Sequence, residues 1–173
     1  MTGKIWAGKG WTGKVWTGRA WLGLAVALLA ACSPGAGGAA PAPTPTVHPE
    51  SGLKVIPLTV TSASGTHRFR VEVAATSAEQ ARGLMFRTRL GPDEGMIFPM
   101  NPPRGASFWM KNTVIPLDLI FIAPDGRISN IAAQAIPYDL SPLTSIGPVK
   151  GVLELAGGRA AELGIVPGDK VAW

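Results

Sequence analysis

The sequence predicts a mainly β fold, a single small antiparallel β-sandwich or barrel with one or two short helices. Short apolar runs, some alternating with polar residues and some continuous, recur along residues 54–173. Glycine, proline and serine turn signals separate these runs at short intervals. Only two segments carry helix signals, and both are short. This region is long enough for one domain with a hydrophobic core.

Residues 1–31 are predicted to be a signal peptide. Basic residues precede an apolar run from Ala20 to Ala31, which is too short to cross a bilayer. The run ends in Leu29-Ala30-Ala31-Cys32, which resembles the lipobox of bacterial lipoproteins. The resemblance implies cleavage before Cys32 and lipidation of this residue. It also implies a lipid-anchored protein of the cell envelope, facing the periplasm from the outer membrane where the organism has one.

Residues 32–53 are predicted to form the lipidated Cys32 and a tether rich in proline, alanine and glycine. This segment has too few large apolar residues to fold alone. The leader holds four of the 16 basic residues and none of the 11 acidic ones, so the mature chain is nearly neutral. This near-neutral charge argues against a nucleic-acid partner. Because the lone cysteine is expected to be acylated, we expect no disulfide in the mature protein.

The first two predicted strands form a hairpin. Ile56, Leu58 and Val60 alternate with other residues, and a turn is expected at Ser64-Gly65. Residues 67–73 then alternate cleanly. The alternation predicts that Phe69, Val71 and Val73 point inward and that Arg68, Arg70 and Glu72 point outward.

A capping box, Thr76-Ser77-Ala78-Glu79, predicts a short helix from Ser77 to Arg82 or Leu84. A second short helix is expected over residues 158–163, with Gly164 as its C′ residue. A long loop is expected over residues 137–148. The further predicted strands cover residues 95–98, 107–110, 117–122, 127–133, 149–155 and 170–173.

Five ordered motifs carry a family resemblance. They are Ala81–Arg87, Gly95–Phe98, Phe108–Asp118, Val152–Gly158 and Gly164–Asp169. Together they resemble the bacterial and archaeal family called domain of unknown function 192, and the resemblance extends from about Val55 to Trp173. It implies a small, mainly β domain that is often exported and has no established activity.

Asp118 opens a strand that is apolar on both faces, so we expect its carboxylate to be at least partly buried. A buried carboxylate needs a partner, and Arg82 and Arg87 are the obvious candidates. One interpretation is a structural ion pair that locks the helix to the sheet. The other is the polar floor of a pocket.

Trp109, Lys111 and Asn112 lie at the end of a predicted strand, with Trp109 and Lys111 on one face. An indole, an ammonium and an amide could hold a small polar ligand. The alternative is a core tryptophan, a snorkelling lysine and a turn asparagine. Met85, Met96 and Met110 could form a thioether site for cuprous ion, but their apolar neighbours favour core packing.

Missing residue types exclude several catalytic centres. The folded region contains one histidine, His67, and no free thiol, which leaves no pair of histidine or cysteine ligands for zinc. We therefore expect no metal and no cofactor. Several carboxylates remain, but no spacing singles out a catalytic pair among Asp93, Glu94, Asp118 and Glu154.

We expect a binding module for a small polar molecule, a glycan or a protein partner. Its expected ligand site consists of Arg82, Arg87, Trp109, Lys111, Asn112 and Asp118. The alternatives are a hydrolase or lyase that uses Asp118 as its base, and a purely structural envelope module. The sequence identifies neither a ligand nor a reaction.

Overall fold

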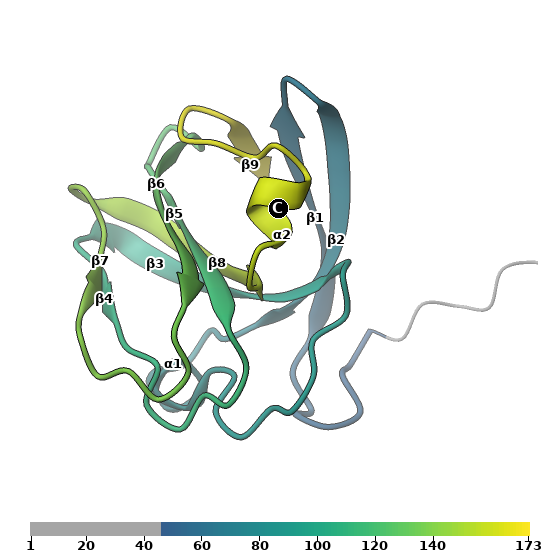
Figure 1. Ribbon diagram of the computed structural model, residues 1–173, viewed down its shortest axis with the longest axis vertical. Coiled ribbons are helices and arrows are strands. Elements are labelled where there is room, and N and C mark those ends of the chain that lie inside the picture. The colour runs from purple at the N-terminus through teal and green to yellow at the C-terminus, as the bar shows by residue number, and fades with distance from the viewer. Residues whose placement is uncertain (1–45) are drawn as a thin grey trace, which may run out of the picture. The chain divides into compact units, whose positions relative to one another are not determined.

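The structure is a computed structural model that describes residues 46–173. The predicted signal peptide, Cys32 and most of the predicted tether lie outside the described residues. The described part contains a seven-stranded sheet, a two-stranded sheet and two short helices (Figure 1). The predicted mainly β fold is therefore confirmed.

The large sheet has the strand order β6-β5-β8-β3-β2-β1-β9. Its pairs are antiparallel except for β2 and β3, which run parallel, so the sheet is mixed rather than purely antiparallel. It is an open sheet that curves around one of the helices, α2 (Figure 1). The strands are β1 (Val55–Ser62), β2 (Gly65–Val73), β3 (Glu94–Arg104), β5 (Leu117–Ile122), β6 (Ile128–Ala135), β8 (Val149–Ala156) and β9 (Lys170–Ala172).

The small sheet pairs β4 (Ser107–Phe108) with β7 (Leu143–Thr144). Strand β7 lies within residues 137–148, which the sequence predicts as a loop. The two helices are α1 (Ser77–Arg82) and α2 (Arg159–Glu162), close to their predicted positions. The predicted β1–β2 hairpin is also confirmed, with a two-residue connection between Ser62 and Gly65.

The capping box fixes where α1 begins. The Thr76 hydroxyl accepts a hydrogen bond from the Glu79 amide, and the Glu79 carboxylate accepts from the amides of Thr76 and Ala75. These hydrogen bonds, that of Thr76 first, lower the pKa of Glu79. The Gln80 side chain donates to the carbonyls of Ala74 and Pro99 and so ties α1 to the end of β2 and to β3, two interior strands of the large sheet.

Hydrophobic clusters cover both faces of the large sheet. The cluster on the α2 side includes Val71, Ile97 and Leu153. The cluster on the opposite face includes Met96, Phe98, Leu119, Phe121 and Val152. Side chains of one strand alternate between faces, so Val152 and Glu154 of β8 point toward the second cluster.

Glu72 is buried, and the prediction that it points outward is wrong. The alternation in β2 is correct, but the face that receives Glu72 is covered rather than open to solvent. The Arg87 guanidinium binds both Glu72 carboxylate oxygens, at 3.0 and 3.2 Å. This bidentate pairing makes a buried carboxylate tolerable there.

Residues 46–53, the end of the predicted tether, fold against the domain. Val47 forms an isolated bridge with Lys54, and Leu53 packs on the second hydrophobic cluster. The Ser51 hydroxyl donates to Glu72, and the Glu50 carboxylate lies 3.1 Å from Arg87 Nε. Polar partners on the domain thus fix a segment that lacks a core of its own. In the described part of the chain, neither helix has the length and apolarity needed to cross a membrane.

Candidate functional site

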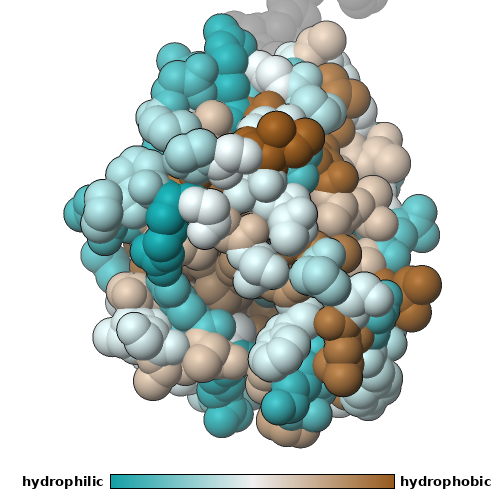
Figure 2. Space-filling view, turned by 90° about the vertical axis from the view of Figure 1, so that its left-hand side faces the viewer, coloured by the Kyte–Doolittle hydropathy of each residue, from teal (hydrophilic) through white to brown (hydrophobic). Residues whose placement is uncertain are grey.

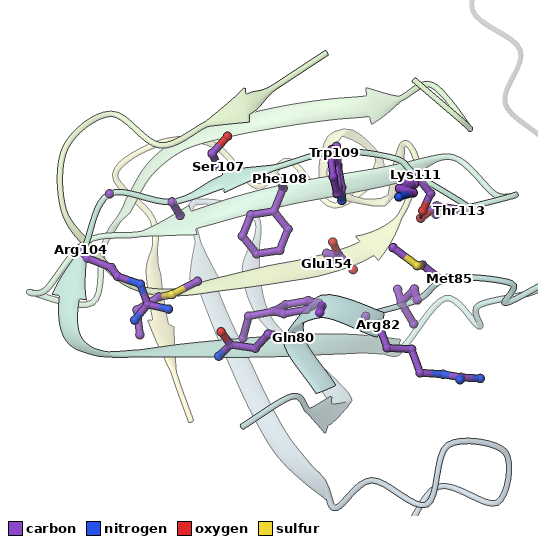
Figure 3. A pocket seen from close by; sticks show the side chains of 17 residues that line it. Gln80, Arg82, Met85, Arg104, Ser107, Phe108, Trp109, Lys111, Thr113 and Glu154 are labelled. Atoms are coloured by element: carbon purple, nitrogen blue, oxygen red, sulfur yellow. Dashed lines mark hydrogen bonds between the residues drawn. The ribbon is translucent and has the colours of Figure 1, made fainter. Parts of the chain in front are cut away.

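A pocket of about 450 Å³ opens on the face of the sheet that carries the second cluster (Figure 3). The end of α1 and the turn after it form one wall, and the segment from Arg104 to Thr113 forms another. Side chains of β3 and β8 lie between these walls. Its principal lining residues are Arg82, Leu84, Met85, Phe98, Met100, Arg104, Phe108, Trp109, Lys111, Thr113 and Glu154.

Glu154 lies on the floor of this pocket. Its neighbours in register are Leu119 on β5 and Met96 on β3, so the carboxyl interrupts an apolar row across the sheet. Glu154 is only 5% exposed, and its Oε2 atom has no hydrogen-bond partner within the described residues. Burial raises the pKa of Glu154 to about 8, so the group is mostly protonated at neutral pH.

Glu72 provides an internal comparison for Glu154. Both face the same side of the sheet, one on each flank of Met96. Glu72 has Arg87 as a bidentate partner, whereas no cationic side chain pairs with Glu154 in the described structure. A buried polar group without a partner is rare in folded proteins and costs free energy of folding. Glu154 therefore requires an explanation other than stability.

Aromatic and thioether side chains line the walls above Glu154. The rings of Phe98 and Phe108 meet edge to face with centroids 5.0 Å apart. The Phe108 ring also packs edge to face on that of Phe121, with centroids 6.4 Å apart. Gly83, with φ of 47°, ends α1 at a point where a Cβ atom would lie 3.3 Å from the Phe98 ring. A glycine there lets the turn approach the aromatic wall closely.

Three cationic side chains, Arg82, Arg104 and Lys111, stand around the pocket. Figure 3 shows Arg104 on one side of Glu154 and Arg82 and Lys111 on the other, with the Arg82 guanidinium directed outward. Lys111 Nζ lies 5.3 Å from the centroid of the Trp109 ring, a cation–π distance. Trp109 is 53% exposed, which leaves its ring available at the pocket rim.

The structure brings three of the predicted site residues together, since Arg82, Trp109 and Lys111 all line this pocket. Asn112 lies beside them in an unusual conformation with φ of 55°. The side-chain amide of Asn112 donates to Met85 Sδ at 3.7 Å, and the backbone carbonyl of Asn112 accepts a hydrogen bond from the Phe86 backbone amide. Asn112 therefore shapes the adjoining turn, and its side chain is not among the pocket lining.

Asp118 is fully buried, as expected for this strand, but its predicted pairing with Arg82 or Arg87 is wrong. Asp118 Oδ1 accepts from the amides of Gln134 and Gly158, and Oδ2 accepts from that of Ala160, all at 2.8–2.9 Å. These bonds tie the start of α2 and a bulge in β6 to β5. Both oxygens are therefore occupied by backbone amides, and Asp118 is not among the lining residues of the cavities described here.

Arg87 lies away from the Glu154 pocket because it pairs with Glu72. It lines a second cavity of about 450 Å³ together with Glu50, Leu53 and Phe86. This cavity shares Arg82, Gly83 and Met85 with the first, so the turn after α1 separates the two. Of the predicted set of six residues, Arg82, Trp109 and Lys111 line the first cavity, and Arg87 lines the second, which Arg82 also reaches. Asn112 lies in the adjoining turn, and Asp118 forms the backbone clamp.

Glu154 is the residue whose importance the sequence analysis missed. The signal was present, because Glu154 is the single charged residue in the apolar run from Val152 to Ala156. A strand that is apolar on both faces places every residue in the interior. Glu154, like Asp118, is therefore expected to be buried from the apolar residues on both sides of it. Among the described residues, no group of three or more His, Cys, Asp or Glu side chains could hold a metal ion.

Residues 59–173 match the sequence model of DUF192, a family described as "Uncharacterized ACR". A crystal structure of a protein of unknown function from Novosphingobium aromaticivorans DSM 12444 shares 64% identity. Its TM-score is 0.74, and the match covers 76% of this chain and 94% of that one. A candidate transcription regulator from Sinorhizobium meliloti 1021 shares 40% identity with a TM-score of 0.67, covering 69% of this chain and 94% of that one. No curated protein matches the chain at a significant level.

Proposed function

This chain belongs to the DUF192 family, and we propose that its domain is a binding module for a small molecule held in the Glu154 pocket. The observation that carries this proposal is the Glu154 carboxyl, which is nearly fully buried, has one oxygen without a hydrogen-bond partner among the described residues, and belongs to the lining of an open cavity. A bound molecule would supply a hydrogen bond to this carboxyl. Pockets with apolar walls and a few polar groups are the usual form of small-molecule sites.

The energetics favour a functional role for Glu154 over a structural one. Removing a carboxyl from water without a hydrogen bond destabilises a fold, and a leucine or methionine would match its neighbours Leu119 and Met96. A purely structural module would gain nothing from an acid at this position. Strained or destabilising groups that face a cavity are concentrated at binding and catalytic sites.

A protein partner is the alternative ligand class, and the surface supports it less. Figure 2 shows the face that carries the small sheet, and its apolar residues form separate patches among hydrophilic ones. Protein interfaces usually centre on a continuous, well-packed apolar core. The pocket gives a more specific recognition element than this face does.

A ligand screen on the folded domain, Ala42–Trp173, tests the proposal. In the Novosphingobium crystal structure the match covers 94% of the chain, so the matching part accounts for nearly all of that folded chain. We expect at least one envelope metabolite or cell-wall fragment to raise the melting temperature. A ligand at 100 times its Kd adds about 2.7 kcal/mol of stability.

Two variants decide whether such a ligand occupies this pocket. Glu154→Gln changes only the acid, and Trp109→Ala removes the exposed ring at the pocket rim. Both should lose the ligand-induced shift, whereas Arg68→Ala, on an exposed residue outside the pocket, should keep it. A shift that survives both pocket variants would contradict the proposal.

Acid–base catalysis is a second candidate function, favoured by one observation. A carboxyl with a pKa of about 8 can donate and accept a proton near neutral pH, as a general acid or base must. Glu154 would then take the role that the sequence analysis gave to Asp118. Turnover of a screened substrate that disappears in Glu154→Gln while binding remains would favour this function over binding alone.

We also propose that the chain is exported and anchored to the cell envelope through a lipid on Cys32. The support is the sequence Leu29-Ala30-Ala31-Cys32 at the end of a short apolar run. Mass spectrometry of the membrane fraction should find acylated Cys32 at the mature amino terminus. Cys32→Ala should leave the protein unprocessed or soluble. An intact leader that carries a free Cys32 thiol would contradict the proposal.

A further inference from the structure

We infer that the Glu154 pocket selects a zwitterionic ligand, with an ammonium group that meets Glu154 and a carboxylate that meets the cationic rim. The ligand class is an amino acid or short peptide with an apolar side chain. This inference rests on the proposed binding function and makes it chemically specific. It follows from the order of charges along the pocket, with an acid at the floor and bases at the entrance.

Glu154, at the floor of the pocket, favours a ligand group that donates a hydrogen bond and carries positive charge. Leu119 and Met96, the neighbours of Glu154 in register, are apolar and cannot hydrogen-bond to it. An organic ammonium on the pocket side of the carboxyl would donate a hydrogen bond to Glu154 and would also pair with its charge once Glu154 ionises. The edge-to-face pair Phe98 and Phe108 adds aromatic surface, which attracts cations.

The rim calls for negative charge. Arg82, Arg104 and Lys111 are the charged side chains that share the pocket with Glu154. A simple amine would have to pass these three cations, and their like charge disfavours it. A carboxylate on the same molecule reverses the sign of that interaction, because Arg and Lys bind carboxylates directly.

The walls call for an apolar body between the two charges. Leu84, Met85, Met100 and the phenylalanine rings face the space between floor and rim. Free amino acids and short peptides share this combination of charges and differ in how far the carboxylate lies from the ammonium. The separation between Glu154 and the rim cations therefore decides which of the two fits better.

Isothermal titration calorimetry of the Ala42–Trp173 domain at pH 7 tests the inference with matched probes. Phenylalanine carries both charges, phenethylamine lacks the carboxylate, and 3-phenylpropionate lacks the ammonium. We expect phenylalanine, or the dipeptide phenylalanylglycine, to bind at least about tenfold more tightly than either single-charge probe. Whichever zwitterion binds better identifies a free amino acid or a peptide as the ligand source.

Proton release gives a second readout. Glu154 is mostly protonated in the free pocket at pH 7 and must lose its proton to pair with an ammonium. Titrations in buffers of different ionisation enthalpy should therefore show release of about one proton for each zwitterion bound. No histidine lines the pocket.

Three variants separate floor from rim. Glu154→Gln should abolish proton release and reduce phenylalanine affinity to that of 3-phenylpropionate. Lys111→Ala should reduce the ratio of the affinity for phenylalanine to that for phenethylamine. Because Lys111 is exposed, the variant should still fold. Arg68→Ala controls for net charge and should change neither the number of protons released nor the affinity for phenylalanine.

Two results would overturn the inference. If 3-phenylpropionate or phenethylamine binds as tightly as the zwitterions and Glu154→Gln abolishes that binding, the pocket binds small molecules of another class and the proposed function stands. If none of the four probes binds, the zwitterion inference is wrong, and the separate ligand screen then decides the proposed function.

Discussion

At the scale of single residues, three buried carboxyl groups have three different environments, and only two of them have all of their hydrogen-bond partners within the described structure. Asp118 is bound by three backbone amides, and Glu72 is bound by the Arg87 guanidinium. Glu154 has a free oxygen and faces a cavity. The first two hold elements of the fold together, whereas the third is the group on which the proposed binding function rests, and each arrangement has a measurable consequence.

The pH dependence of stability should reveal Glu154. Its pKa is raised from 4.5 to about 8 in the folded state, so the folded protein binds more protons than the unfolded chain between these values. Stability relative to Glu154→Gln should therefore fall as pH rises through this window, by about 1 kcal/mol for each pH unit, and then level off. Denaturant melts of both proteins from pH 5 to pH 9 measure the difference. Parallel curves would show that Glu154 is not buried as described.

Asp118→Asn should destabilise the domain by roughly 2–4 kcal/mol. An asparagine keeps one acceptor oxygen. Its NH2 group would replace Oδ2 and would face the Ala160 amide, so that two donors would meet. Asp125→Asn is the matched control, because Asp125 is exposed and accepts one bond, from the Arg127 amide. Urea melts should show a loss for Asp118→Asn several times larger than for the control. Equal losses would mean that the three-amide clamp contributes little.

At the scale of elements, the short helix α1 depends on its cap because none of its residues is buried. Thr76→Ala removes the bond to the Glu79 amide and should cost about 0.5–2 kcal/mol of stability. Hydrogen exchange should become faster in α1, which contributes Gln80 and Arg82 to the pocket wall. Ser77→Ala, one residue later, removes no capping bond and should leave both measurements unchanged. If the two variants behave alike, the capping box does not hold α1 in place.

Elements with local signals could be predicted from the sequence, and those that depend on distant partners could not. The capping box and the β1–β2 hairpin need only neighbouring residues. The parallel pairing of β2 with β3 and the β4–β7 sheet join segments separated along the chain. Glu72 was predicted to be exposed but is buried, because its partner Arg87 comes from a distant segment, after a helix and a turn. The pocket likewise needs tertiary structure, so the sequence indicated Arg82, Trp109 and Lys111 but not their relation to Glu154.

At the scale of the whole molecule, the segment of residues 46–53 belongs to the domain. A domain that begins at Lys54 should be less stable than Ala42–Trp173 by about 1–3 kcal/mol. It loses the bonds from Ser51 and Glu50 to the buried Glu72–Arg87 pair and the packing of Leu53. Urea melts of the two domains compare them directly. Equal midpoints would show that this segment adds nothing to the fold.

The strand order also has a consequence for how the molecule is made. Strand β8 joins β3 to β5 at the centre of the sheet, and β9 pairs with β1 at its far edge. A growing chain therefore lacks its central strand until nearly all of the domain has been synthesised. Long-range pairings of this kind slow folding, because distant segments must meet before contacts stabilise them. The topology therefore delays completion of the sheet until β8 has been synthesised and can insert between β3 and β5.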